Sequence, residues 1–518
     1  MKINMLNESG IIILDFGSQY TQLIARRIRE NNVYSEILSP ETKIDEILSK
    51  KPAGLILSGG PNSVYKSDAP KFDTRILSLD IPIMGICYGL QLLAHKDGGR
   101  ISSSGDGEYG FASININKQS GLFSNISSES EVWMSHGDKI EEMPDRWQIL
   151  ATSSNGVIAA IGNENQSRVA TQFHPEVSHT KEGKEIISNF LFKISNCTPN
   201  WTAGNFINEQ INIIRERIGK KKVLVGVSGG VDSTVVAALL HKAVGENSIA
   251  VLIDHGLLRK NEAIDCVDAL QKGLGVNINS YDESESFLSK LNMITDPEKK
   301  RKIIGNEFIF SFERIAENLG KIDFLAQGTL YPDIVESGFS KGKSAHVIKS
   351  HHNVGGLPEN MDFELIEPLK DLFKDEVRKV GLELGLPKSL IQRHPFPGPG
   401  LGVRIIGEIS RSRIKILQEA DKIYMDILVE DNLYDEIWQA FAVLIPVQTV
   451  GVMGDQRTYE NLLGLRAVTS QDGMTADWFR MPPDTLSKIS NRIVNNVQGI
   501  NRVVYDITSK PPGTIEWE

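Results

Sequence analysis

Two short motifs in the first third of the chain place a cysteine and a histidine where they could react together. GICYG sets Cys87 between two glycines, after the apolar run IPIM and before the helical pattern LQLLAHK. A nucleophile at a sharp strand-to-helix turn needs small neighbours, because the two backbones approach closely there. The N-terminus of the following helix also favours a thiolate. The pattern predicts a cysteine nucleophile at a tight turn.

A base for that cysteine is predicted by QFHPE, at the end of the strand-like run SRVATQF. His174 and Glu176 are two residues apart, so their side chains point the same way in extended chain. A carboxylate that orients an imidazole completes a nucleophile–base set. LILSGGP adds Gly59 after another predicted strand, where backbone N–H groups could stabilise an oxyanion. Each motif alone has an ordinary structural alternative, a core thiol or a capped turn, but the three in this order favour catalysis.

A third motif, GVSGGVDST at 226–234, predicts a phosphate-binding turn that lacks a lysine. It continues the strand-like run KVLVGV at 222–227 and leads into the helical pattern TVVAALLHKAV. Serine hydroxyls and successive glycine N–H groups at a helix N-terminus can hold phosphates without a cation. A P-loop would carry a lysine and a dinucleotide loop would read G-x-G-x-x-G, and this stretch has neither. A plain glycine-rich turn remains the alternative, which IDHG at the end of the next predicted strand makes less favoured.

The elements that must position these motifs form two successive patterns of alternating strands and helices. From residue 10 to about 195, strands such as GIIILDF and IPIMGICYG alternate with helical stretches, and later runs including SRVATQFHPE look antiparallel. After the polar joint NCTPNWTAGN the alternation restarts, and RHPFPGPGLG at 393–402 ends it. We predict an α/β fold with two doubly wound, mostly parallel-sheet domains and a small C-terminal α+β domain, at residues 1–200, 201–393 and 394–518.

Composition limits the class of protein. The 518 residues carry a formal net charge of −10, which argues against broad binding of nucleic acid. Three cysteines without a CxxC pair indicate neither disulfides nor zinc, and two adjacent histidines lack a third ligand, so we assign no transition metal. No apolar run approaches the roughly 20 residues of a membrane span. We expect a cytoplasmic protein without nucleic-acid or membrane partners.

GGP, GICYG and HPE, in this order, resemble a class I glutamine amidotransferase domain. The resemblance implies that Cys87 attacks the carboxamide of glutamine and releases ammonia through a glutamyl thioester. His174 would move the proton and Glu176 would hold the ring. The backbone N–H groups of Gly59 and Tyr88 would bind the oxyanion. The stretch MSHGD resembles a family loop that helps to hold the glutamine.

SGGVDS resembles the PP-loop of ATP pyrophosphatases. The resemblance implies cleavage between the α- and β-phosphates of ATP, so a lysine on the γ-phosphate is not required. Magnesium must accompany the phosphates, and Asp232 could help to place it, although solvent exposure of this carboxylate is an equal alternative. The residues implied in ATP binding are Ser228, Gly229, Gly230, Val231, Asp232, Ser233 and Thr234.

The remaining motifs, QGTLYPDIVES, IKSHHNVGGLPE, RHPFPGPGLG and KPPGTIEWE, resemble the glutamine-hydrolysing GMP synthetase family over essentially the whole chain. The implied reaction converts XMP, ATP, glutamine and water into GMP, AMP, pyrophosphate and glutamate. XMP would be adenylylated at its C2 oxygen, and ammonia would displace AMP. The resemblance carries XMP binding to Arg301, Gln439, Lys510 and Glu516, and weaker pyrophosphate contacts to Lys349, His351 and Lys374.

Several alternatives stay open at this point. For Lys510 and Glu516 the alternative is a frayed, solvated end of the chain, and for Lys374 it is an exposed helix face. The third segment resembles the family's dimerisation domain, which implies a homodimer. Three other functions compete with GMP synthesis. They are another amidotransferase–PP-loop ligase such as NAD synthetase, a PP-loop enzyme acting on transfer RNA, and a non-catalytic nucleotide sensor. The acidic balance disfavours the RNA enzyme, and the complete cysteine, histidine and glutamate set disfavours the sensor.

Overall fold

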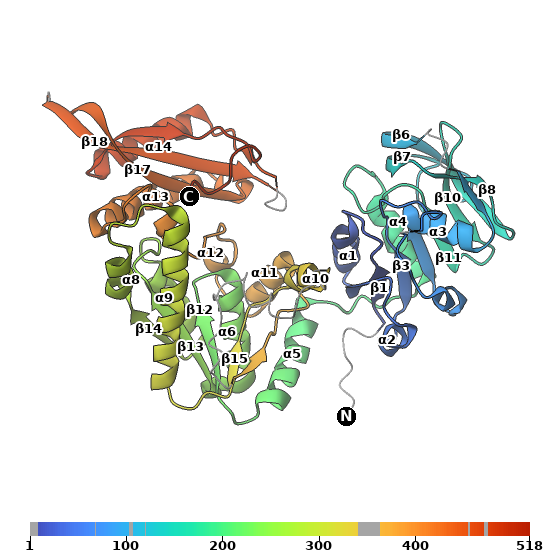
Figure 1. Cartoon of the computed structure of the whole chain (residues 1–518), viewed down its shortest axis with the longest axis horizontal. Helices are drawn as coiled ribbons and strands as arrows, with labels where there is room; N and C mark the ends of the chain where they lie inside the picture. The colour runs from blue at the N-terminus through green and yellow to red at the C-terminus, as the bar shows by residue number, and fades with distance from the viewer. Residues whose placement is uncertain are drawn as a thin grey trace. The chain divides into compact units, whose positions relative to one another are not determined.

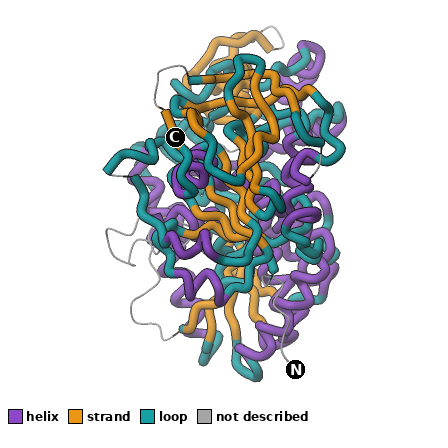
Figure 2. Tube along the Cα trace, turned by 90° about the vertical axis from the view of Figure 1, so that its right-hand side faces the viewer, coloured by secondary structure: helices purple, strands orange, loops and turns teal. Residues whose placement is uncertain are grey.

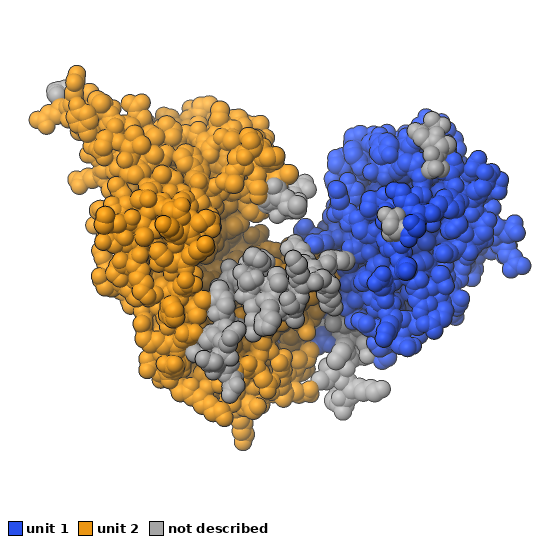
Figure 3. All heavy atoms as spheres, viewed as in Figure 1, with its two compact units in different colours: residues 1–209 blue, residues 210–518 orange. Residues whose placement is uncertain are grey.

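The computed structural model describes residues 9–67, 69–102, 107–119, 121–339, 363–453, 456–470 and 475–518. The chain divides into two compact units, Met1–Glu209 and Gln210–Glu518 (Figure 3). Each unit is built on a sheet with helices packed against it (Figure 1, Figure 2). The predicted α/β class with parallel sheets is therefore confirmed.

The described part of the first unit contains a nine-stranded sheet with the order β2-β1-β3-β4-β11-β10-β9-β6-β7. Strands β2, β1, β3, β4 and β11 pair in parallel, and the others pair antiparallel. The strands of this sheet are β1 (Ile11–Leu14), β2 (Ser35–Leu38), β3 (Gly54–Leu57), β4 (Ile83–Ile86), β6 (Glu108–Ile116), β7 (Glu129–His136), β9 (Trp147–Ser153), β10 (Ile158–Asn163) and β11 (Arg168–Thr171). The remaining elements are the separate pair β5 (Arg100–Ser102) and β8 (Lys139–Glu142), with helices α1 (Thr21–Arg29), α2 (Ile44–Ser49), α3 (Tyr88–Lys96) and α4 (Gly183–Asn189).

The parallel strands of the first unit are apolar along their whole length. Every residue of β1, β3 and β4 is buried, because helices cover both faces of a parallel sheet. Helix α1 packs Ile24, Ala25 and Ile28 inward at helical spacing. This explains why the sequence predicted these strands and this helix correctly.

Strand β11 differs from its prediction. We expected it among the added antiparallel strands, but it pairs in parallel with β4, with Thr171 opposite Ile86, and antiparallel only with β10. Val169, Ala170 and Thr171 are fully buried, as in the centre of a sheet covered on both faces. The parallel pairing brings the segment after β11 to the same sheet edge as Cys87, which follows β4.

The second unit begins with a five-stranded, all-parallel sheet with the order β14-β13-β12-β15-β16. Strands β13 and β14 lie on one side of β12, and β15 and β16 on the other. The strand order therefore reverses between β12 and β15, and the chain leaves these two strands toward opposite sides of the sheet. Ligands of α/β sheets bind at such a point. The elements are β12 (Val223–Val227), β13 (Ser248–Asp254), β14 (Ile278–Asp282), β15 (Phe324–Ala326), β16 (Glu364–Ile366), and helices α5 (Ala203–Ile218), α6 (Val231–Val244), α7 (Glu262–Leu274), α8 (Ser284–Leu291), α9 (Pro297–Asn318), α10 (Tyr331–Phe339), α11 (Lys374–Glu383) and α12 (Lys388–Ile391).

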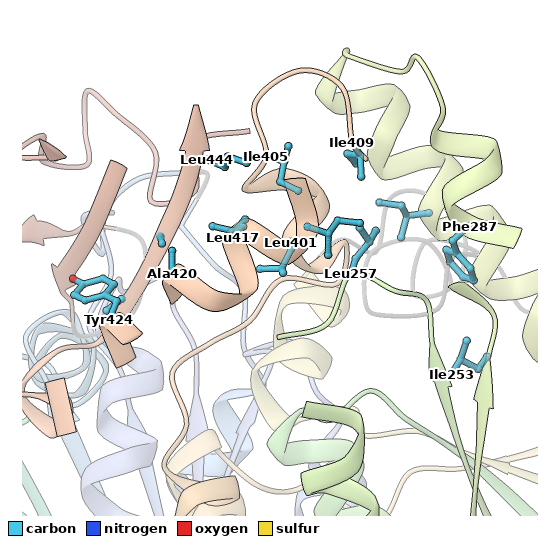
Figure 4. Close-up of a cluster of buried hydrophobic side chains, with 14 of the residues drawn as sticks. Ile253, Leu257, Phe287, Leu401, Ile405, Ile409, Leu417, Ala420, Tyr424 and Leu444 are labelled. Atoms are coloured by element: carbon cyan, nitrogen blue, oxygen red, sulfur yellow. The ribbon is translucent and has the colours of Figure 1, made fainter. Parts of the chain in front are cut away.

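The last segment adds an α+β layer to this unit. Its elements are α13 (Arg411–Glu430), β17 (Gln439–Met453), β18 (Gln456–Thr469), β19 (Asp477–Trp478), α14 (Pro483–Asn496) and β20 (Ile500–Tyr505). One buried apolar cluster runs from Ile253 and Phe287 beside the parallel sheet to Leu417 on α13 and Leu444 on β17 (Figure 4). The last segment therefore shares its core with the parallel-sheet part of the unit.

No helix in the described ranges is long and apolar enough to cross a membrane.

Leu417→Ala should lower the free energy of unfolding of the second unit by about 3 kcal/mol, because Leu417 is fully buried in the shared cluster and its truncation leaves a cavity. Since α9 and α14 both contribute residues to this cluster, amide hydrogen exchange should become faster in α9 and in α14 together. Hydrogen-exchange mass spectrometry measures both helices in one experiment. Leu382→Ala on α11, where the side chain is 39% exposed, is the control and should change little. Faster exchange confined to residues 411–505 would show two separate cooperative units.

Candidate active sites

Cys87 lies at a strand-to-helix turn with an unusual backbone conformation. It connects β4 to α3 with φ of +52°. A Cβ atom at Gly85 would lie 2.6 Å from the backbone of Gly89, and one at Gly89 would collide with the carbonyl oxygen of Leu57. The N–H of Cys87 donates to the carbonyl of Thr171 at 2.7 Å. The flanking glycines are thus required by close backbone approach, as the sequence predicted.

His174 and Glu176 form a buried pair directly after β11. The Nδ1 of His174 is 2.7 Å from Oε1 of Glu176, and the two side chains are 4% and 0% exposed. The ring of Tyr20 packs edge-on against the imidazole at 5.1 Å. Thr180 Oγ1 donates to the carbonyl of His174 at 2.6 Å. These contacts fix the ring with its Nδ1 on the carboxylate, which leaves Nε2 for other partners.

The protonation of His174 is set by opposing effects. Burial acts against the charged ring and is the largest single effect, but the charge of Glu176 and the interaction with Cys87 together raise the pKa of His174 well above its ordinary value. A cationic ring beside Cys87 stabilises the thiolate form of the sulfur. The pair can therefore supply both the charge that favours a nucleophile and a proton for a leaving group.

The surroundings of the sulfur are made by polar backbone and side-chain groups. The Sγ of Cys87 is 3.6 Å from the carbonyl oxygen of Ser135, within the MSHGD stretch at 134–138, and Gln172 Nε2 is 3.8 Å from the sulfur. A Cβ atom at Gly59 would lie 3.3 Å from Cε1 of His174, so the glycine lies against the ring. Tyr88 is the first residue of α3, directly after the cysteine. The structure thus gathers every residue predicted for this site.

Sequence reasoning missed two glutamines of this site. Gln172 points to Cys87, and Gln91 on α3 donates to the carbonyl of Asp138 at 2.9 Å, which holds the turn after β7. A signal for Gln172 was present, because it precedes His174 by two residues and shares its face in extended chain. Gln91 carried no such signal, since its partner is 47 residues away along the chain.

Hydrogen bonds from its own hydroxyl groups fix the 228–234 loop. Gly229 has φ of +73°, a conformation that favours glycine. Ser233 Oγ accepts from the N–H of Ser228 at 3.2 Å and donates to the carbonyl of Gly230 at 3.2 Å. Thr234 Oγ1 donates to the same carbonyl at 2.7 Å. The loop opens the 14-residue helix α6, whose N-terminal amides favour an anion.

Asp232 and Lys374 meet at this loop. Lys374 Nζ lies 2.6 and 2.7 Å from the two carboxylate oxygens of Asp232. A Cβ atom at Gly328 would lie 3.1 Å from Cβ of Asp232, so the QGTL stretch after β15 lies beside the loop. Lys349 and His351 lie outside the described residues. The structure therefore brings Lys374 to the predicted nucleotide loop, although its side chain is also 48% exposed at the start of α11.

Arg393, which sequence reasoning did not assign, also contacts this loop. Its guanidinium donates to the carbonyl of Gly229 and to the carboxylate of Glu262. The other oxygen of Glu262 accepts from the N–H of Arg259 at 2.8 Å. Arg393 opens the RHPFPGPGLG motif, but no local pattern could reveal partners 164 and 131 residues away.

The last residues of the sequence are packed and paired. Ile515 is buried in a cluster with Phe441 and Val468 on the last sheet. Glu516 accepts two bonds from Arg404, at 2.8 and 3.1 Å, and one from Gln439 at 2.8 Å. The alternative of a frayed, solvated end is therefore wrong for Glu516.

Three of the four residues predicted for XMP lie around this tail. Gln439 contacts Glu516, and Arg301 donates to the main-chain oxygen of Glu518, whose carboxylate pairs with Lys300. Lys510 is placed by its backbone, which pairs with Ala476 at 2.8 and 3.1 Å. Within the described residues, no group of three or more His, Cys, Asp or Glu side chains could hold a metal ion.

Three known families match parts of this chain. Residues 12–194 match "Glutamine amidotransferase class-I", residues 204–307 match "NAD synthase", and residues 426–517 match "GMP synthase C terminal domain". The first match spans the cysteine site, the second spans the 228–234 loop, and the third spans Gln439 and the packed tail.

Curated relatives match over nearly the whole length. "GMP synthase [glutamine-hydrolyzing]" of Carboxydothermus hydrogenoformans is 54% identical, covering 98% of this chain and 100% of its own. The proteins of the same name from Thermosipho melanesiensis and Aquifex aeolicus are 52% and 53% identical over 98% of this chain and 99% of theirs. The fold and the two sites define a glutamine amidotransferase joined to an ATP-using ligase. The chain belongs to the glutamine-hydrolysing GMP synthase family, and the resemblance found in the sequence is confirmed.

Glu176→Gln should lower the pKa of His174, because the carboxylate is the strongest group that favours the charged ring. NMR titration of the full-length chain with labelled histidine measures this pKa, and His174→Gln identifies the resonance. Glu182→Gln is the matched control, since Glu182 accepts from Ser127 on the same unit. An unchanged pKa of His174 in Glu176→Gln would contradict the assigned cause.

The raised pKa of His174 also determines whether stability rises or falls with pH. In the folded chain the His174 pKa lies above the unfolded value of about 6.5, so its contribution to stability is fully present below that value. The contribution is lost as the pH rises through the folded pKa. In Glu176→Gln this pH-dependent contribution should become smaller, as measured by denaturant unfolding at several pH values.

Proposed function

We propose that this protein makes GMP from XMP, using ATP and glutamine and releasing AMP, pyrophosphate and glutamate. The observation that carries the proposal is the match to GMP synthases over 98% of this chain. The reaction belongs to GMP biosynthesis and uses only small molecules, without nucleic-acid or membrane partners. Three free cysteines and a net charge of −10 support a cytoplasmic protein of this kind.

In the glutaminase half, Cys87 is the nucleophile. The thiolate attacks the carboxamide carbon of glutamine, and the N–H groups of Gly59 and Tyr88 bind the oxyanion. His174 gives its proton to the departing ammonia and then takes one from the water that hydrolyses the thioester. Glu176 keeps the ring oriented through the 2.7 Å bond to Nδ1. Ammonia and glutamate are the products of this half.

In the synthetase half, the 228–234 loop holds the phosphates of ATP. The C2 oxygen of XMP attacks the α-phosphorus, and pyrophosphate leaves as one unit, which explains a phosphate loop without lysine. Ammonia then adds to C2, and AMP departs. Lys374 is supported as a pyrophosphate contact by its place at Asp232, and Lys349 and His351 are assigned to the same role. Mg²⁺ enters with ATP, and the Asp232 carboxylate is a suitable oxygen ligand.

The XMP residues are assigned around the packed tail. The guanidinium of Arg301 and the ammonium of Lys510 suit the phosphate of XMP. Glu516 accepts hydrogen bonds from the sugar or base, and Gln439 fixes that carboxylate at 2.8 Å. The clustering of Arg301, Gln439 and Glu516 around one packed tail supports this assignment.

The three functional parts are residues 1–200 for glutaminase, 201–393 for ATP binding and 394–518 for XMP binding and dimerisation. Large apolar side chains stay exposed on the last sheet, among them Val450, Val452 and Tyr459 on β17 and β18. Exposed apolar groups of this kind mark a contact surface. We assign it to the two-fold interface of a homodimer.

A product assay with ATP, XMP and glutamine tests the reaction. Phosphorus NMR should show AMP and pyrophosphate in equal amounts, with no ADP, because the inner phosphoanhydride bond is broken. Deamido-NAD in place of XMP is the control and should give no turnover. ADP and orthophosphate as products, or turnover of deamido-NAD instead of XMP, would contradict the proposal.

Cys87→Ala should abolish glutamine-dependent GMP formation and leave the reaction driven by a high ammonium concentration near the wild-type rate. Only the supply of nitrogen is lost in this variant, because the 228–234 loop and the packed tail belong to the other compact unit. Cys197→Ala, which removes a buried thiol outside the site, is the control and should retain both activities. A folded Cys87→Ala enzyme that ammonium fails to rescue would show that the two sites are not divided as proposed.

A further inference from the structure

Phe396, in the RHPFPGPGLG motif, is surrounded by three arginines. The guanidinium carbons of Arg404, Arg259 and Arg393 lie 4.9, 5.2 and 5.8 Å from the centre of its ring. These distances are within the range of cation–π attraction. The ring itself packs against the apolar cluster shared by both parts of the second unit. Phe396 is therefore a fixed aromatic surface against which three charged side chains are placed.

Each arginine is neutralised by a different carboxylate. Arg259 lies 3.2 Å from Asp421, and Arg404 lies 2.8 Å from Glu516. Arg393 pairs with Glu262, and both of these side chains are largely buried. The carboxylates offset the mutual repulsion of three cations around one ring. Arg393 and Arg404 bond to the loop and to Glu516, so they act on a substrate through these two protein groups.

Arg393 connects the ring to the nucleotide loop. It donates to the carbonyl of Gly229, the residue of the loop with positive φ. A Cβ atom at Gly229 would lie 3.3 Å from the same guanidinium nitrogen and 3.1 Å from Glu262. The arginine and its carboxylate thus lie against Gly229 and limit how the amides of the loop can turn.

Arg404 connects the same ring to the XMP residues. It is fully buried, between Phe396 at 4.9 Å and Phe441 at 4.1 Å, and it holds Glu516 with two bonds. The rings fix the plane of the guanidinium, and a planar fork in turn fixes the plane of the carboxylate. Phe441 contacts Arg404, whereas Phe396 contacts both Arg404 and Arg393.

We propose that Phe396 is a positioning residue shared by both substrate sites: its ring orients Arg393 against Gly229 of the ATP loop and Arg404 against Glu516. The inference rests on the proposed function, in which ATP occupies the 228–234 loop and XMP contacts Glu516. Without the aromatic face, both guanidinium groups lose a directional contact and sample more orientations. Affinity for ATP and for XMP should then fall together, although Phe396 need touch neither substrate.

The experiment compares Phe396→Leu with the matched variant Phe441→Leu in the full-length enzyme. GMP synthesis driven by ammonium isolates the second unit from the glutaminase. Phe396→Leu should raise the KM for ATP and the KM for XMP, each by about threefold to tenfold, with kcat within about twofold of wild type. Phe441→Leu should raise the KM for XMP and leave the KM for ATP unchanged. Phe396→Tyr, which keeps the aromatic face, should restore both KM values.

The outcomes separate this inference from the proposed function. Failure of the wild-type enzyme to make GMP would overturn the proposed function, whereas the pattern among the variants decides the role of Phe396. Wild-type KM values in Phe396→Leu, or a change confined to one substrate, would overturn the shared role. A lower kcat together with a lower Tm, while both KM values stay unchanged, would also overturn the shared role. That result would show that Phe396 contributes only to packing. Phe396→Met replaces Phe396→Leu if the leucine variant does not fold, and the same criteria apply to it.

Discussion

Parallel pairing of short buried strands is the constraint on which both sites depend. Strands β4 and β11 pair in parallel, so Cys87 and His174 emerge at the same edge of the first sheet. In the second sheet, β12 and β15 pair in parallel at the point where the strand order reverses. That pairing brings the loop after β12 beside the QGTL stretch, with Gly328 against Asp232. Each site is thus assembled from chain segments that only sheet pairing brings together.

The close pairing works because small residues allow the backbones to meet. At the cysteine turn, a side chain at Gly85 or Gly89 would clash with neighbouring backbone atoms. The positive φ of Cys87 has a cost in backbone strain, which the hydrogen bond from its N–H to Thr171 helps to offset. Cys87 is consequently fixed by the sheet itself, and its side chain is directed toward Ser135 and Gln172.

The parts of this architecture that the sequence predicted are the local ones. The cysteine turn, the nucleotide loop and the buried strands follow from neighbouring residues, whose apolar periodicity and glycines are visible in a short window. The parallel direction of β11 was missed because a strand of four residues carries little information about its partner. Arg393 and Arg404 were missed because Glu262 and Glu516 lie 131 and 112 residues away along the chain. Long-range charge pairing leaves no local pattern.

Those two arginines also show how charge is used differently in the two sites. At the cysteine, the buried Glu176 carboxylate and the interaction with Cys87 raise the pKa of His174, which favours the charged ring beside the sulfur. Around the nucleotide loop and the tail, the buried guanidinium groups are already paired with Glu262 and Glu516. A paired arginine adds little net attraction for a phosphate, but it holds a loop or a carboxylate in one orientation. The described arginines around the 228–234 loop and the tail therefore set geometry more than they add net positive charge, in a chain whose formal net charge is −10.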